Sequence, residues 1–94
     1  MTVVEILKQA GECEDHVLRE HATLLALSKM SRYEAECALF EEKYAEPFHA
    51  FKERVRSMLN EEDFQMDDDL MDWEFAHTAL SWWKDKLEEI RHVG

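Results

Sequence analysis

The scarcity of turn-forming residues constrains the fold of this chain more than any other feature of its sequence. Two glycines and one proline occur in 94 residues, and the stretch from Asp15 to Ala45 contains neither type. A β-sheet needs a turn between successive strands, and such turns depend largely on glycine and proline. The sequence therefore predicts an all-α protein, and its length predicts a single helical domain over residues 1–94.

The first half of the chain predicts one short and one long helix. A helix over residues 2–10 begins with a capping box and is followed by a glycine that suits its end. The next helix extends over about residues 15–45, because nothing in that stretch breaks it. A second capping box could instead start a new helix after a break near residues 28–31. We favour the continuous helix.

The second half predicts two further helices. Pro47 suits the first position of a three-turn amphipathic helix over about residues 47–60. The last helix extends over about residues 68–92, and the acids of Asp67–Asp69 suit its N-terminal cap and the positive end of its dipole. A wide apolar face on this helix carries all three tryptophans of the chain.

The long helix is apolar on more sides than one small domain can cover. Along it, one face carries apolar residues at spacings of 4, 4, 3, 4, 3 and 4, typical of a helix packed on another helix. Three leucines, Leu24, Leu25 and Leu27, point in other directions. A helix that is apolar on nearly every side is buried on nearly every side. We therefore expect a helical homodimer that forms through the long helix.

The acidic residues are concentrated in one segment. The chain has 11 basic and 22 acidic residues and a formal net charge of -11. Such a balance argues against direct binding of nucleic acid and of anionic membranes, since both require a basic surface. Residues 61–74 contain eight acids and no base, and aromatic and apolar residues are interleaved with them. This segment is either a solvated loop and helix start or a surface that docks on a basic partner protein.

Three Glu-x-x-His pairs raise the alternative of a metal- or small-ligand-binding bundle, because di-iron carboxylate bundles use such pairs on inward-facing helices. The pairs are Glu46/His49, Glu74/His77 and Glu89/His92. On a helical wheel, Glu74 falls in the middle of the polar face, where it cannot complete a closed bundle site. We therefore predict no metal, no cofactor and no enzymatic activity, since the chain also lacks a phosphate-binding glycine loop.

The cysteine content and the lack of long apolar segments indicate in which cellular compartment the protein is expected. Cys13 and Cys37 are too few for a disulfide framework, and Cys37 falls in the apolar stripe of the long helix. The longest apolar run, residues 24–27, is far too short to span a bilayer, and the N-terminus lacks the pattern of a signal peptide. We expect free thiols in a cytoplasmic protein.

A spaced series of aromatic motifs carries a resemblance to a known group of proteins. The chain has Phe-Glu-Glu-Lys-Tyr at residues 40–44, then Phe48 and Phe51, then Trp73-Glu74 and Leu87. Over about residues 28–90 it resembles small acidic helical proteins of archaea and bacteria, some of which are antitoxin halves of toxin–antitoxin pairs. Members often have glycine after the tyrosine, where this chain has Ala45. The resemblance implies a non-catalytic protein that neutralises a basic partner.

Composition and resemblance together predict a non-catalytic, antitoxin-like protein-interaction module. Its binding surface would combine aromatic anchors with acidic residues that attract a basic partner. A DNA mimic, whose acids imitate a phosphate track, is a further alternative. The predicted partner-binding residues are Tyr33, Phe40, Tyr44, Asp67, Asp68, Asp69, Asp72, Trp73, Phe75 and Trp82.

Overall fold

The computed structural model describes residues 1–58 and 63–92 and consists of four helices. The helices are α1 (Val3–Gln9), α2 (Glu14–Tyr44), α3 (Phe48–Ser57) and α4 (Phe64–His92). No strand occurs in these residues, so the all-α prediction is confirmed.

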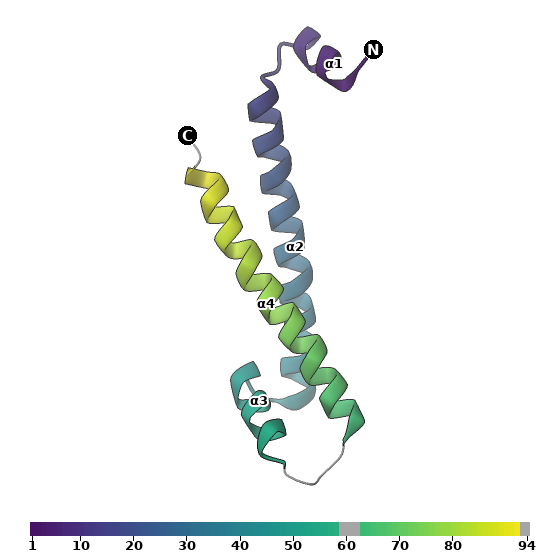
Figure 1. Cartoon of the computed structure of the whole chain (residues 1–94), viewed down its shortest axis with the longest axis vertical. Helices are drawn as coiled ribbons and strands as arrows, with labels where there is room; N and C mark the ends of the chain where they lie inside the picture. The colour runs from purple at the N-terminus through teal and green to yellow at the C-terminus, as the bar shows by residue number, and fades with distance from the viewer. Residues whose placement is uncertain (59–62, 93–94) are drawn as a thin grey trace.

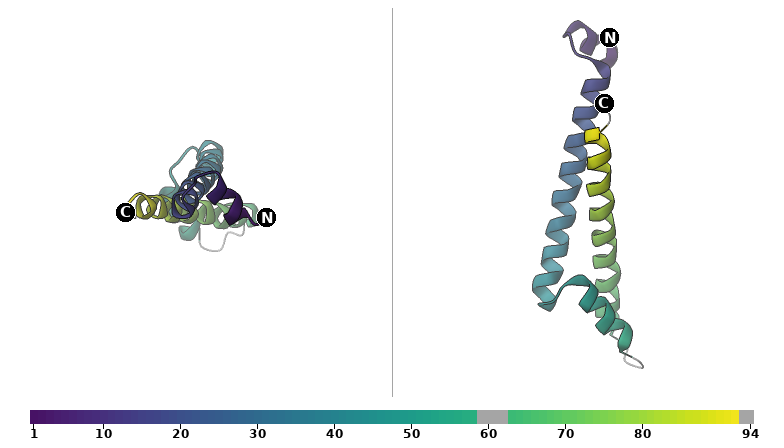
Figure 2. Two further views of the ribbon diagram at one scale, coloured as in Figure 1. Left: turned by 90° about the horizontal axis from the view of Figure 1, so that it is seen from above. Right: turned by 90° about the vertical axis from the view of Figure 1, so that its left-hand side faces the viewer.

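The two long helices form an antiparallel hairpin. In Figure 1, α2 descends from the N-terminal end and α4 returns alongside it, crossing it at an angle. Figure 2 shows α3 bridging the space between the end of α2 and the start of α4. The molecule measures 65 × 27 × 20 Å, and its radius of gyration is 19.6 Å. A compact domain of this length would have a radius of gyration of about 12 Å, so much of the hairpin lies outside any common core.

The boundaries of α2 agree with the sequence prediction. The helix is continuous through residues 28–31, so the alternative of two helices is wrong. The short helix α1 is also as predicted, and the Thr2 side chain accepts a hydrogen bond from the backbone N–H of Glu5 at 3.1 Å. Gly11 follows it with a φ of 79°, a conformation that glycine adopts without strain.

Two predicted boundaries in the second half need correction. Helix α3 ends at Ser57, and residues 59–62 lie outside the described part of the chain. Helix α4 begins at Phe64 and not near residue 68. Its N-terminal cap is Asp63, whose Oδ1 accepts a hydrogen bond from the backbone N–H of Met66 at 3.1 Å. The run of three aspartates suggested a later start, but it lies inside the helix because Asp63 already caps the preceding turn.

The packed core lies at the end of the molecule that contains α3. We call this end the closed end; it comprises α3, residues 33–44 of α2 and residues 66–83 of α4. Phe51 and Trp73 are fully buried there. The Trp73 ring lies 5.3 Å from that of Phe51, 5.4 Å from that of Phe48 and 5.7 Å from that of Phe40, measured between centroids. Three helices thus share one aromatic cluster centred on Trp73.

A tight turn connects α2 to α3. Ala45 has φ 54° and ψ 36°, in the left-handed region, and its N–H donates to the Glu41 carbonyl at 2.7 Å. A non-glycine residue in this region costs about 1–2 kcal/mol. The turn therefore forms at Ala45 without a glycine, and it forms at a conformational cost.

Cys13 is exposed and Cys37 is buried, and both thiols are free, as predicted. They stand 24 residues apart along α2, or about 36 Å, too far for a disulfide with each other. Burial raises the pKa of the Cys37 thiol, and the neighbouring acids Glu41 and Glu36 add to the effect. No helix of the described residues has the length and apolarity that a bilayer span requires.

Candidate functional site

An exposed face of α4 combines apolar and acidic side chains. Six exposed residues lie along it at successive spacings of 3, 1, 3, 1 and 3 residues, which places them on one side of the helix. The buried residues Trp73 and Ala76 lie on another side. We call this surface the acidic face of α4; it consists of Phe64, Asp67, Asp68, Met71, Asp72 and Phe75.

The apolar side chains of the acidic face are unusually exposed. Phe64, Met71 and Phe75 have exposed fractions between 64% and 72%. Scattered single apolar residues on a surface need no explanation, but three on the same side of 12 consecutive helical residues form a patch. Such a patch is typical of a surface that another molecule covers.

The carboxylates of the acidic face are not neutralised within the chain. Asp67, Asp68 and Asp72 make no ion pair with any residue that the structure describes. Helix α4 has no lysine or arginine before Lys84. The acidic face therefore carries three uncompensated negative charges between its apolar side chains, and it attracts cationic groups.

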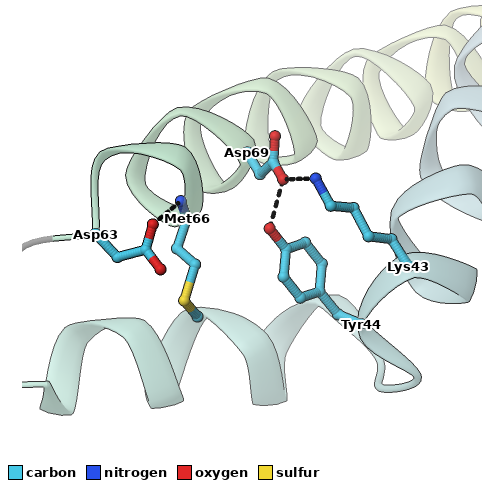
Figure 3. A network of polar contacts seen from close by, with 5 residues as sticks. All are labelled: Lys43, Tyr44, Asp63, Met66 and Asp69. Atoms are coloured by element: carbon cyan, nitrogen blue, oxygen red, sulfur yellow. Dashed lines mark hydrogen bonds and ion pairs between the residues drawn. The ribbon is translucent and has the colours of Figure 1, made fainter.

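Asp69 differs from its neighbours because it points toward α2. Figure 3 shows its carboxylate between Lys43 and Tyr44. One oxygen accepts from the Lys43 Nζ at 2.6 Å and from the Tyr44 hydroxyl. The hydrogen bonds from Lys43 and then Tyr44 lower the pKa of Asp69, while burial and the Asp69 carboxylate raise the pKa of Tyr44 to about 12. Through these contacts Asp69 connects α4 to the C-terminal end of α2.

A groove lies beside the acidic face, between α2 and α4. Its volume is about 430 Å³. Apolar side chains and charges of both signs line it, and Arg32 pairs with Glu36 at 3.3 Å. Asp72 and Phe75 belong both to the groove and to the acidic face, so the two surfaces are continuous. The groove is lined by Arg32, Glu36, Leu39, Phe40, Lys43, Asp72 and Phe75.

The structure separates the six predicted aromatic anchors into three pairs by their burial. Tyr33 and Trp73 are buried in the core. Phe40 and Tyr44 are half-buried, and their rings stack on that of Trp73 at centroid distances of 5.7 and 6.4 Å. Phe75 and Trp82 remain exposed. These two are the predicted aromatic anchors whose side chains are largely accessible to a partner.

The predicted partner-binding residues did not include Phe64 and Met71, although both are interleaved with the acids of residues 61–74. A helix start near residue 68 puts them in an acidic loop and a first helical turn, where a common face cannot be defined. Once the helix begins at Phe64, Met71 lies seven residues on and Phe75 four residues beyond it. The cap at Asp63 was the signal that could have revealed this face.

The Glu-x-x-His pairs do not gather into one place. His77 stacks on Phe48 at a centroid distance of 4.7 Å, and the hydrogen bond from Lys52 lowers the pKa of Glu74. Among the described residues, no group of three His, Cys, Asp or Glu side chains could hold a metal ion. Each glutamate of the three pairs instead contacts a basic side chain: Glu46 with Arg54 at 2.7 Å, Glu74 with Lys52 at 2.8 Å and Glu89 with Lys86 at 3.0 Å.

Comparisons of the chain with protein-family models, with curated proteins and with solved structures find no match. The resemblance to antitoxin-like proteins therefore stays a prediction. Of the residues that carry it, Phe51, Trp73 and Leu87 are buried in this structure.

Proposed function

We propose that this chain is a non-catalytic protein-interaction module, antitoxin-like in binding and neutralising a basic partner protein through the acidic face of α4. One observation carries the proposal: three exposed carboxylates without an ion pair in the described residues share a helical face with three exposed apolar side chains. Phe75 also packs edge-to-face on Tyr33 at a centroid distance of 5.9 Å, but a purely solvated helix face would not need Phe64 and Met71.

The two kinds of side chain would contribute differently to binding. Complementary charge accelerates encounter and excludes wrong partners, while affinity comes mainly from a few apolar anchors in well-packed pockets. A fitting partner therefore presents lysines or arginines around apolar pockets on a surface that accepts one helix. Asp72 and Phe75 also line the neighbouring groove, so the interface can extend over Leu39 and Phe40 of α2.

The test uses the protein encoded beside this chain as the candidate partner. Association is measured by pull-down and calorimetry at low and high salt. The variant D67N/D68N/D72N should weaken binding at least about tenfold, since each charge pair at an interface contributes on the order of 0.5–1 kcal/mol or more. The effect should shrink at high salt because ions screen exposed charges.

A matched control removes the same charge elsewhere. Glu34, Glu42 and Asp85 are exposed and make no ion pair with the residues that the structure describes. The variant E34Q/E42Q/D85N should bind as the unchanged chain does. Absence of any association at low salt, or equal weakening by both triple variants, would contradict the role of the acidic face.

Self-association in the cytoplasm is the second part of the proposal. The elongated shape and the exposed leucines of α2 support a homodimer, because a single chain leaves these side chains in water. Analytical ultracentrifugation at micromolar concentration should give the mass of a dimer. A monomer under those conditions contradicts this part and leaves the partner-binding part intact.

A further inference from the structure

The N-terminal end of the hairpin is the least covered part of the molecule. We call it the N-terminal arm; it comprises α1 and residues 14–30 of α2. Figures 1 and 2 show α2 continuing past the end of α4. Leu18, Leu24, Leu25 and Leu27 have exposed fractions of 41% to 66%, and Ala26 is the buried residue of the arm. Helix α1 buries no residue. Most of the stability of a helix in a protein comes from packing of its apolar face, so a second surface that covers these leucines would stabilise the arm.

One stripe of the arm has the spacing of a helix–helix seam. Asp15, Leu18, Ala22, Leu25 and Lys29 follow one another at intervals of 3, 4, 3 and 4 residues. The stripe is symmetric about Ala22. A leucine lies about one turn from it on either side, and a charged residue lies seven residues from it on either side, acidic before it and basic after it.

We propose that a second copy of this chain packs antiparallel along this stripe, with the two α2 helices crossing near Ala22. Leu18 of one chain then packs against Leu25 of the partner subunit. Asp15 faces Lys29 of the partner subunit, and the same contacts repeat through the two-fold axis. The proposal rests on the self-association proposed above and names its surface and its direction.

The charges decide between the two possible directions. An antiparallel pair places Asp15 opposite a lysine at each end of the stripe, whereas a parallel pair places Asp15 opposite Asp15 and Lys29 opposite Lys29. Neither residue makes an ion pair with the described residues of its own chain. Asp15 is exposed and Lys29 is half-buried, and only the antiparallel direction brings opposite charges together.

The charge of the arm also indicates that a second copy of this chain, and not the basic partner, packs on it. Residues 14–30 carry three acids and two bases, whereas residues 63–75 carry six acids and no base. Two acidic faces would repel each other, but two arms of mixed charge would not. The antiparallel pairing also places the two closed ends, with their acidic faces, at opposite ends of the dimer, where both can bind a basic partner.

Cysteine cross-linking tests the arrangement in the full chain, in a C13S background. Across an antiparallel seam, the thiol introduced by L18C or by L25C would stand about 10 Å from its own copy along the helix axis, beyond disulfide reach. We expect L18C alone and L25C alone to form little disulfide dimer, and an equimolar mixture to form the mixed L18C–L25C dimer. In a parallel seam, by contrast, L18C alone and L25C alone would each form a disulfide dimer between two copies of the same variant.

A charge exchange provides a second readout that does not depend on thiols. D15K alone and K29D alone should each weaken the dimer severalfold in sedimentation equilibrium, and D15K/K29D should restore it. The controls E34K and K84D change the net charge by the same amounts at exposed positions outside the stripe, and they should not reproduce the pattern.

The outcomes separate the two proposals. A monomeric chain overturns the self-association itself. A dimer in which L18C or L25C cross-links with its own copy overturns the antiparallel direction. A dimer that shows no mixed cross-link and no response to the charge exchange uses another surface. Only the mixed cross-link, together with restoration in the double charge variant, supports the proposed seam.

Discussion

The closed end and the N-terminal arm both consist of helices that carry large apolar side chains and charged side chains. They differ in how far the apolar side chains are buried. At the closed end, α3 fills the space between α2 and α4, and Phe51 and Trp73 are fully buried. In the arm, no third helix of the described residues covers α2, and its leucines remain largely in water. Apolar content alone therefore does not make a core.

The difference has a geometric cause. Two helices in a hairpin can each bury one stripe against the other, and the remaining stripes need a third element. Helix α3 has 10 residues and reaches only one end of a molecule 65 Å long. The closed end is therefore stable within one chain, and the arm depends on what packs against it.

The largest expected effect comes from the core tryptophan. Trp73→Ala should reduce the free energy of unfolding by about 3–5 kcal/mol, because it leaves a cavity among three helices. Trp82→Ala removes the same side chain from an exposed site and should cost less than about 1 kcal/mol. Urea unfolding followed by circular dichroism measures both. Similar losses for the two variants would contradict the difference in burial between Trp73 and Trp82.

A pair of leucine truncations compares a buried leucine of α4 with an exposed leucine of the N-terminal arm. Leu87→Ala, at a residue only 4% exposed, should cost about 2–5 kcal/mol. Leu18→Ala, at a residue 60% exposed, should cost less than about 1 kcal/mol in dilute solution. Because dimer stability depends on protein concentration, the cost of Leu18→Ala should grow as the concentration rises. A cost that stays constant over the same range would contradict cover of Leu18 by a second copy.

The turn at Ala45 offers a stabilising change at the closed end. Ala45→Gly should raise the free energy of unfolding by about 1 kcal/mol, since glycine adopts the left-handed conformation without a clash with Cβ. The exposed helical residue Ala35 provides the control, because Ala35→Gly should lower stability by about 0.5–1 kcal/mol. Thermal unfolding measures both, and destabilisation by Ala45→Gly would contradict the left-handed turn.

The smallest expected effect concerns the contact of Asp69 with Lys43 and Tyr44. The pKa of Asp69 is lowered in the folded chain, so its contribution to stability is present above about pH 4 and is lost as the pH falls through the folded pKa. The pKa of Tyr44 is raised to about 12 from an ordinary 10, so its contribution is present below pH 10 and is lost between 10 and 12.

Asp69→Asn should reduce both pH dependences and lower stability at neutral pH by less than about 1 kcal/mol, as expected for a partly exposed ion pair. A tyrosinate titration by ultraviolet absorbance should show the pKa of Tyr44 moving back toward 10. The control Asp68→Asn alters an exposed carboxylate that makes no ion pair in the described residues. An unchanged tyrosinate titration in Asp69→Asn would contradict the Tyr44–Asp69 contact.

Much of the fold followed from local sequence signals. The absence of glycine and proline across residues 15–45 favoured a long helix, and its apolar spacing placed Tyr33 and Cys37 on the buried side. Local signals failed where two of them competed. Three consecutive aspartates suggested one helix start and Asp63 provided another, so the beginning of α4 was misplaced, and Phe64 and Met71 could not be assigned to one helical face with the acids.

The aromatic residues show why the candidate site could be predicted only in part. A helical wheel gives the direction of a side chain relative to its own helix, but it does not say which direction another helix will occupy. Tyr33, Trp73 and Phe75 were equally plausible anchors on that basis. Packing of α3 and α2 against one side of α4 buried Trp73 and left Phe75 exposed on another.

The sequence by itself determined that this chain is helical, where its long helix begins and ends, and that its negative charge lies in one segment, because backbone propensity and charge are local properties. Only the tertiary structure decided which acids face solvent. Asp69 turns toward Lys43 and Tyr44, while Asp67, Asp68 and Asp72 face water. The reason is that α4 packs along one side, and neighbouring residues on a helix point about 100° apart.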